Sequence, residues 1–390
     1  MSDRSTKRES GFSLLEMMIA MALGGLVLGA AVQLYSQGVA ATWTASQRAE
    51  LQQDFRAASN ILTKDLSLAG AGLNPGAAIA LPSAIAPVVG CDQTPKCYIA
   101  ETYPAPGGQP TLYGLIPGYQ KGPKLTSNPE PTDAVTVAYT DSSFYLNCYT
   151  ATVGPAPGFV TFGPDTTPDP KTGLLPVFPP GGCLPNGVAA PQNVNDATVG
   201  LTPGDLVYFP SLNGTIMVGE VTPGAITTGV NAVGTTYTVP FAVGDPLHMN
   251  QLTAGKGLNS VALGATGTSP QRLLVITYYI DNTVTPSQLM RQVSGHTPMP
   301  VADGTVYVKF SYDLFNDATG LPATDQPNPG SGDANDTASN GLLPNQITKI
   351  NIKHMAMESA LKGIKGYQGL DLETSVSARN LTFVNNYPNQ

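Results

Sequence analysis

An apolar run with a single charged residue dominates the start of this chain. It reads FSLLEMMIAMALGGLVLGAAV from Phe12 to Val32, and Glu16 is its only charge. At about 1.5 Å per residue, the run is long enough to cross a bilayer core of roughly 30 Å as one helix. A carboxylate costs about 2.5–3.5 kcal/mol at the membrane centre and less toward the ends of such a segment. We therefore expect an interaction that compensates for Glu16.

The helical pattern continues well beyond the apolar run. No proline occurs between Phe12 and Leu73, and apolar residues recur at steps of three and four. This stripe consists of Leu51, Phe55, Ala58, Leu62, Leu66 and Ala69. The spacing predicts one helix over residues 12–69, apolar on all sides in its first half and amphipathic in its second half. Gly70 and Gly72 supply the stop signal.

The charges before the apolar run predict its orientation. Arg4, Lys7 and Arg8 stand against Asp3 and Glu9, a modest cationic bias that holds the N-terminus in the cytoplasm. The rest of the chain is then expected outside the cytoplasm. A secretory signal would instead have a shorter apolar region and small residues at a cleavage site.

The formal net charge is −8 and no later tract is basic, so bulk charge argues against a nucleic-acid partner.

Four cysteines lie in one part of the chain: Cys91, Cys97, Cys148 and Cys183. Their even number favours disulfides in an oxidising compartment, and three connectivities are possible. Close spacing favours the pairs Cys91–Cys97 and Cys148–Cys183. Zinc is disfavoured because no C-x-x-C occurs and the histidines are far apart. These histidines are His248, His296 and His354.

Residues 75–265 differ sharply from the helical region. Most of the 35 prolines lie in the first part of this segment, and its apolar pieces are short. The composition predicts a large Pro/Gly-rich insertion of irregular chain and short strands, with the disulfides inside it. Its strand candidates are residues 134–140, 143–149, 205–210, 215–221 and 236–241.

Residues 270–390 show a more regular β pattern. The expected strands are residues 272–280 and 288–293, which form a hairpin, followed by 305–314, 347–355 and 373–384. An antiparallel sheet made of these strands would bury the apolar stripe of the long helix. The predicted fold class is therefore α+β.

The sequence GFSLLE and the apolar run after it resemble the processing motif of type IV prepilins and of type II secretion pseudopilins. The resemblance implies that residues 1–11 are a leader, and that prepilin peptidase cuts between Gly11 and Phe12 and methylates the new amine of Phe12. In these families a glutamate placed like Glu16 interacts with the N-terminal amine of a neighbouring subunit. The alternative is a plain membrane anchor with Glu16 at the level of the headgroups.

The resemblance also divides the long helix and implies a type IV pilin-like fold. Residues 12–32 would be the transmembrane and filament-core half, and residues 33–74 the amphipathic half. Within the first half, Gly25 and Gly29 form a small-xxx-small pattern that lets two helices approach closely. Pilin helices also loosen in this part when they pack in a filament, so local unwinding is a second interpretation. The sequence does not choose between them.

Shorter stretches extend the resemblance to the PilW type of minor pilin, which is related to the J-type pseudopilin of type II secretion. They are KDLSLAGAG, the hairpin with ITYYIDN and QLMRQV, ADGTVYVKFSYDL and SVSARNL. Coverage is roughly residues 1–75 and 270–385. Residues 76–265 contain no stretch that extends the resemblance, so a function located there stays open.

The resemblance implies a minor pilin of a type IV pilus that helps to initiate assembly and lies at the tip, supporting twitching motility, adhesion or DNA uptake. Its expected partners are prepilin peptidase, other minor pilins, the major pilin and the inner-membrane assembly platform. It would be a single-pass inner-membrane protein with a periplasmic domain before it enters the extracellular pilus. Two alternatives are a J-type pseudopilin and a tip adhesin that binds through residues 76–265.

No catalytic motif occurs, so neither an enzyme nor a cofactor is expected. H-E-x-x-H, G-x-S-x-G and the P-loop sequence are all missing.

An acidic loop offers Asp317, Asp333 and Asp336, whose carboxylates are ligands that calcium prefers. Their spacing fails the EF-hand pattern, so a solvated loop is the default interpretation and no metal is expected.

Overall fold

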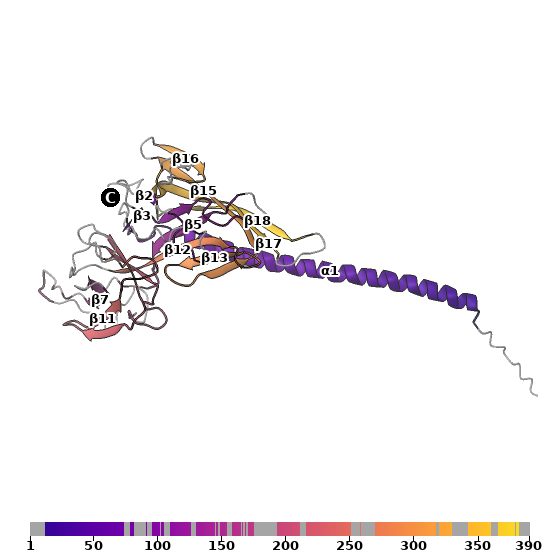
Figure 1. Ribbon diagram of the computed structural model, residues 1–390, viewed down its shortest axis with the longest axis horizontal. Helices are drawn as coiled ribbons and strands as arrows, with labels where there is room; N and C mark the ends of the chain where they lie inside the picture. Colours follow the sequence, from indigo (N-terminus) through magenta and orange to yellow (C-terminus); the bar gives the residue numbers. More distant parts are fainter. Residues whose placement is uncertain are drawn as a thin grey trace, which may run out of the picture.

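A computed structural model describes most of the chain after residue 11. The described residues are 12–73, 79–81, 91, 96–101, 103–104, 110–125, 130–144, 146, 149–153, 158–164, 166, 168, 171–174, 193–210, 216–250, 258, 270–316, 320–329, 342–359, 366–378 and 380–381. They form one long helix that projects from a β-rich head (Figure 1).

The helix α1 runs from Leu14 to Ser67. Its buried apolar residues, with Ala69 just beyond its end, are the six of the predicted stripe: Leu51, Phe55, Ala58, Leu62, Leu66 and Ala69. The prediction of an amphipathic second half is confirmed, since one face packs on the head and the other stays in solvent.

Two glycines end the helix close to the predicted position. Gly70 and Gly72 have φ values of 78° and 72°, in the left-handed region where glycine carries no Cβ penalty. A Cβ at Gly72 would lie 1.8 Å from Thr140 Oγ1. The turn that brings the chain from the helix to the sheet therefore requires glycine at this position.

The main sheet has seven antiparallel strands. Five of them follow in the order β14-β13-β12-β5-β4, and β8 pairs with both β12 and β9. Their bounds are Met299–Asp303 (β14), Gln288–Val293 (β13), Gln271–Asp281 (β12), Ala134–Thr140 (β5), Leu115–Gly118 (β4), Leu206–Pro210 (β8) and Ile216–Glu220 (β9). Strands from the predicted segments 75–265 and 270–390 thus share one sheet.

A second antiparallel sheet follows the order β16-β15-β17-β18. Its strands are Leu321–Gln326 (β16), Thr305–Asn316 (β15), Ile347–Glu358 (β17) and Gly369–Ser377 (β18), and the short 3-10 helix η3 at Pro344–Gln346 precedes β17. The helix stripe and both sheets contribute to one hydrophobic core. Asp133 ties the sheets together, because its carboxylate accepts hydrogen bonds from Lys309 Nζ at 3.1 Å and from the Phe310 N–H at 2.9 Å.

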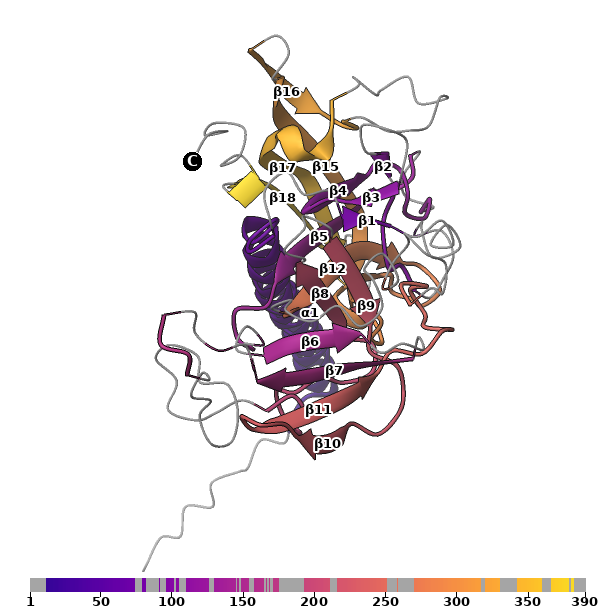
Figure 2. The same cartoon turned by 90° about the vertical axis from the view of Figure 1, so that its left-hand side faces the viewer.

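A third sheet forms what we call the outer lobe, with strand order β10-β11-β7-β6. These strands are Thr227–Val230 (β10), Thr235–Pro240 (β11), Phe159–Pro164 (β7) and Tyr149–Val153 (β6). The lobe has its own core, in which the rings of Phe162, Phe209 and Phe241 pack against one another in tilted and edge-on arrangements. It lies at the opposite end of the head from the β15–β18 sheet (Figure 2). A small sheet completes the head. Its strands, in spatial order, are β1 (Ile79–Ala80), β3 (Pro110–Leu112) and β2 (Tyr103–Pro104).

The predicted α+β class, a long N-terminal helix with antiparallel sheets, is confirmed. Two strand predictions were wrong in their bounds. At 143–149, Ser143 donates its N–H and hydroxyl to Asp141 Oδ1, which makes a turn, and β6 starts only at Tyr149. The last strand runs over Gly369–Ser377, not 373–384, because the chain turns after Ala378 to place Leu381 against Gly70.

We expect Leu62→Ala to lower the free energy of unfolding by about 2–5 kcal/mol, since it removes a large side chain from a filled core. Leu62 is 0% exposed, whereas its neighbour Ile61 is 41% exposed and faces away from the sheets. Ile61→Ala is therefore the matched control and should cost much less. Denaturant unfolding of the full chain in detergent measures both. Equal losses would contradict the packing face assigned to the helix.

Candidate functional site

The start of helix α1 is closed by two reciprocal hydrogen bonds. The Ser13 hydroxyl accepts the Leu15 N–H at 3.3 Å, and the Ser13 N–H donates to Glu16 Oε2 at 3.0 Å. This capping box folds the Glu16 carboxylate back over the first turn, where the positive end of the helix dipole favours an anion. Phe12 directly precedes the cap. Glu16 is therefore held at the point where a cut before Phe12 would create a free amine.

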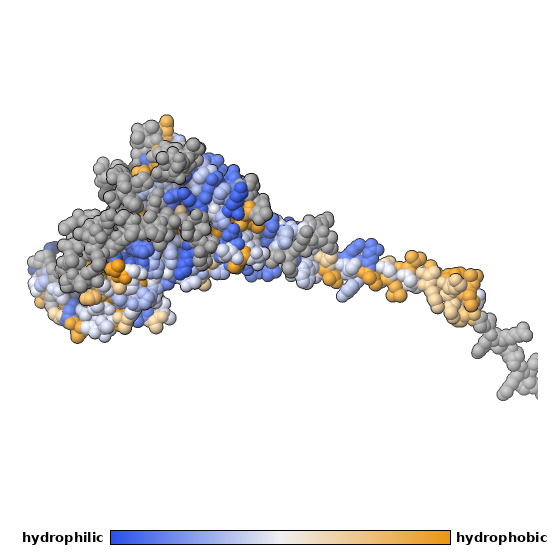
Figure 3. All heavy atoms as spheres, viewed as in Figure 1, coloured by the Kyte–Doolittle hydropathy of each residue, from blue (hydrophilic) through white to orange (hydrophobic). Residues whose placement is uncertain are grey.

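The first half of the helix presents apolar side chains on every side. Phe12 is 89% exposed, and no residue of the most apolar window is buried. Figure 3 shows this end of the helix as a continuous hydrophobic surface beyond the head. The helix is long and apolar enough to cross a membrane. Such a surface requires lipid or other apolar helices around it.

Gly25 and Gly29 lie open on this surface. A Cβ at either position would have no heavy atom within 4 Å. The helix is continuous through both residues in the single chain. Close approach of a second helix at these glycines and local unwinding in a filament both stay predictions.

A buried carboxylate fixes the other end of the helix on the main sheet. Asp65 is 3% exposed. Its Oδ1 accepts the Tyr139 hydroxyl at 3.0 Å, and its Oδ2 accepts the Tyr278 hydroxyl at 2.6 Å and Arg291 Nε at 2.8 Å. We call these four residues the Asp65 cluster. Burial, followed by the Asp65 charge, raises the pKa of both tyrosines well above the usual range, so they stay neutral donors.

The Asp65 cluster joins α1 to three strands at once, since Tyr139 lies on β5, Tyr278 on β12 and Arg291 on β13. The sequence analysis assigned no role to Asp65. The available signal was its position next to Leu66 within the apolar stripe, where an acidic residue must find donors.

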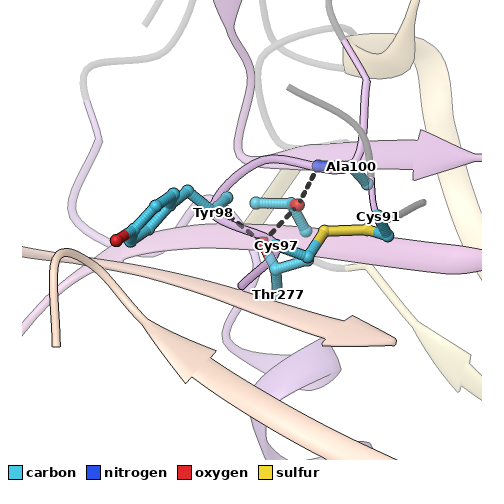
Figure 4. Close-up of a disulfide and its surroundings, with 6 residues drawn as sticks. Cys91, Cys97, Tyr98, Ala100 and Thr277 are labelled. Atoms are coloured by element: carbon cyan, nitrogen blue, oxygen red, sulfur yellow. Dashed lines mark hydrogen bonds between the residues drawn. A yellow bond between two sulfur atoms is a disulfide. The ribbon is translucent and has the colours of Figure 1, made fainter. Parts of the chain in front are cut away.

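The cysteine pair Cys91–Cys97 forms a disulfide, and both residues are buried (Figure 4). The chain after it is attached to the main sheet by two hydrogen bonds. The Ala100 N–H donates to Thr136 Oγ1 at 2.9 Å, and Thr277 Oγ1 donates to the Tyr98 carbonyl at 2.7 Å. Cys148 and Cys183 lie outside the described residues.

The described part of the chain contains no group of three or more His, Cys, Asp or Glu side chains arranged to hold a metal. Two of the three histidines instead contact single carboxylates, His296 with Asp205 and His354 with Asp371, each at 2.9 Å. The calcium candidates Asp317, Asp333 and Asp336 fall outside the described residues, as does Gly11.

The family model of the prokaryotic N-terminal methylation motif matches residues 6–32. The match supports a type IV pilin-like protein that is processed by prepilin peptidase and is associated with the membrane through its apolar helix. It covers residues 6–11 of the expected leader and the apolar half of α1, and none of the head. No curated protein and no solved structure matches the chain.

Proposed function

We propose that this chain is a minor pilin of a type IV pilus, of the PilW type, that helps to initiate assembly and lies at the pilus tip. The observation that carries the proposal is the first turn of α1. There Glu16 lies beside the cleavage position, on a helix whose apolar surface is uncovered. The protein would stand in the inner membrane with its head in the periplasm, and then pass into the extracellular pilus.

Glu16 would act by exchanging its partner during assembly. In the single chain its carboxylate accepts one backbone N–H, that of Ser13. A methylated amine on Phe12 of a neighbouring subunit carries a full positive charge, so it would be the stronger partner among packed apolar helices. The partners in this step would be other minor pilins and the major pilin, on the inner-membrane assembly platform.

The size of the head supports a role at low copy number. A compact domain of about 320 residues has a radius of gyration near 20 Å, whereas a helix is about 10–12 Å across. Heads this wide would crowd one another if every subunit of a helical filament carried one. A position at the tip avoids this crowding.

The outer lobe favours adhesion as an additional role. It lies at the end of the molecule farthest from the free end of α1 (Figure 1). In a tip subunit with its helix in the shaft, this lobe would face outward. A J-type pseudopilin of type II secretion stays the alternative, and loss of exoprotein secretion with normal pili in a deletion strain would favour it.

We expect Glu16→Ala to be cleaved after Gly11 like the wild type but to be lost from filaments. Glu50→Ala, which changes an exposed glutamate of the same helix beyond the apolar run, is the control and should enter filaments normally. Immunogold labelling and immunoblots of sheared pili measure incorporation. Normal incorporation of Glu16→Ala would contradict the role of Glu16. Wild-type protein that is missing from pili would contradict the proposed function.

A further inference from the structure

Two buried carboxyl groups meet where the outer lobe joins the main sheet. Glu220 is the last residue of β9 and is 0% exposed, and Asp245, on the loop after β11, is 2% exposed. One loop donates to both carboxyl groups, the Leu247 N–H to Glu220 Oε2 at 2.8 Å and the Asn250 N–H to Asp245 Oδ1 at 3.1 Å, and this brings the two side chains together. Two ionised carboxylates cannot donate to one another, and both being charged in a buried site is strongly unfavourable. Either a proton or a cation must lie between them.

The surrounding hydrogen bonds distinguish the two carboxyl groups. Asp245 accepts the N–H groups of Met249 and Asn250, the second at 3.1 Å, so both of its oxygens have donors suited to an anion. Glu220 Oε2 accepts the Leu247 N–H at 2.8 Å, but its Oε1 is buried without a hydrogen-bond partner among the described residues. A proton on Glu220 would let this carboxyl donate to Asp245.

A cation fits the site less well. Calcium takes six to eight oxygen ligands. The side-chain amide oxygen of Asn250, Oδ1, already accepts the Glu220 N–H at 2.9 Å. The backbone of Gly295 also closes the site, since a Cβ there would lie 2.1 Å from Glu220 Oε1. One proton is enough to complete the hydrogen bonding of the pair.

We propose that Glu220 and Asp245 share one proton, which fastens the loop of residues 245–250 to strand β9 and releases it when the proton is lost. The same loop holds the lobe through Asn250, whose Nδ2 donates to the carbonyls of Glu220 and Ala242. The attachment of the outer lobe therefore loosens in alkaline surroundings.

Among the described residues, the other charged and titratable side chains on the elements around the pair include His248 on the loop, Tyr208 of β8, His296 after β13, Asp205 before β8 and Arg272 of β12. Asp205 lies 2.9 Å from His296 Nε2 and 3.9 Å from Arg272 Nη1, so these three groups face one another. Burial, and then the Asp245 side chain, raises the pKa of Glu220 from 4.5 to about 8, against the Leu247 hydrogen bond that lowers it.

The direction of the pH effect follows from this raised pKa. The released loop has Glu220 near its ordinary pKa, while the closed loop keeps the proton up to about pH 8. Closure is therefore most favourable below the ordinary value and weakens as the pH rises. The opening equilibrium should grow by about tenfold per pH unit between about 5 and 8 and level off above that.

Hydrogen exchange of the full chain in detergent measures how the opening equilibrium depends on pH. The amides to follow are the three whose N–H groups donate to the carboxyl pair: Leu247, Met249 and Asn250. After correction for the chemical exchange rate, we expect the wild type to lose protection with the stated slope. Glu220→Gln is uncharged at every pH and keeps an N–H for Asp245, so its protection should stay flat. Glu50→Gln, on the exposed helix surface, is the control and should keep the wild-type slope.

Asp245→Asn changes the other carboxyl group of the pair, and its protection should also become independent of pH. This second variant keeps the test decisive if Glu220→Gln folds poorly. A wild-type protein without a slope, or a Glu220→Gln variant that retains it, would overturn the proposal. So would loss of protection on adding a calcium chelator at pH 7 that calcium restores, because a cation would then hold the pair.

Discussion

We expect Asp65→Ala to lower the free energy of unfolding by about 3–5 kcal/mol and to loosen the second half of α1 from the head. The substitution removes the shared acceptor of Tyr139, Tyr278 and Arg291. A charged guanidinium and two hydroxyls would then be left in a largely buried site without their partner, which costs more than the missing contacts alone.

Denaturant unfolding gives the loss of stability, and hydrogen exchange over residues 51–67 shows whether the helix has loosened. Asp54→Ala is the matched control because Asp54 lies exposed on the same helix, and its cost should be small. A loss for Asp65→Ala no larger than that of the control would show that the Asp65 cluster does not hold the helix in place.

The second large effect concerns processing. We expect Gly11→Val to block removal of residues 1–11 completely, because the peptidase must admit the residue before the cut and glycine has no side chain to exclude. The match of the methylation motif over residues 6–32 supports this cleavage. The variant would stay in the membrane as the precursor and be missing from filaments.

Intact mass and N-terminal sequencing of the membrane fraction measure the outcome. The wild type should begin at Phe12 and carry one added methyl group, whereas Gly11→Val should keep the leader. Ser10→Ala is the control and should be processed normally. Cleavage of Gly11→Val at the same bond would contradict the assigned site.

The features that could be predicted depend on residues close together in the sequence. The buried face of α1 follows from spacing within two turns, and each of its six apolar residues is buried. The hairpin of β12 and β13 follows from a short polar turn between two strand-like segments, and Ile276 pairs with Val293. The Gly11, Phe12 and Glu16 motif is likewise local, which is why the sequence alone was enough to identify it.

The features that could not be predicted depend on long-range pairing. Nothing local indicates that β5 and β8, from the proline-rich segment, pair with the adjoining stretches 273–278 and 271–273 of β12. The donors to Asp65 are 74 to 226 positions away in the chain. Glu220 ends strand β9 and Asp245 lies on the loop after β11, and neither residue belongs to a recognisable sequence pattern. Only the fold shows that their carboxyl groups meet. Polar groups whose partners are remote leave no periodic signal.

The free stretch of α1 between the apolar run and the head has a mechanical consequence. Residues 33–39 are all exposed, whereas Ala40, Thr44 and Gln47 are already half-buried, which leaves roughly 10 Å of helix without support at about 1.5 Å per residue. The Asp65 cluster clamps the far end of this rod to three strands. Any push or twist applied to the apolar end is thus delivered to the head as a whole, and the exposed stretch would set the distance between the head and a membrane that holds the apolar run.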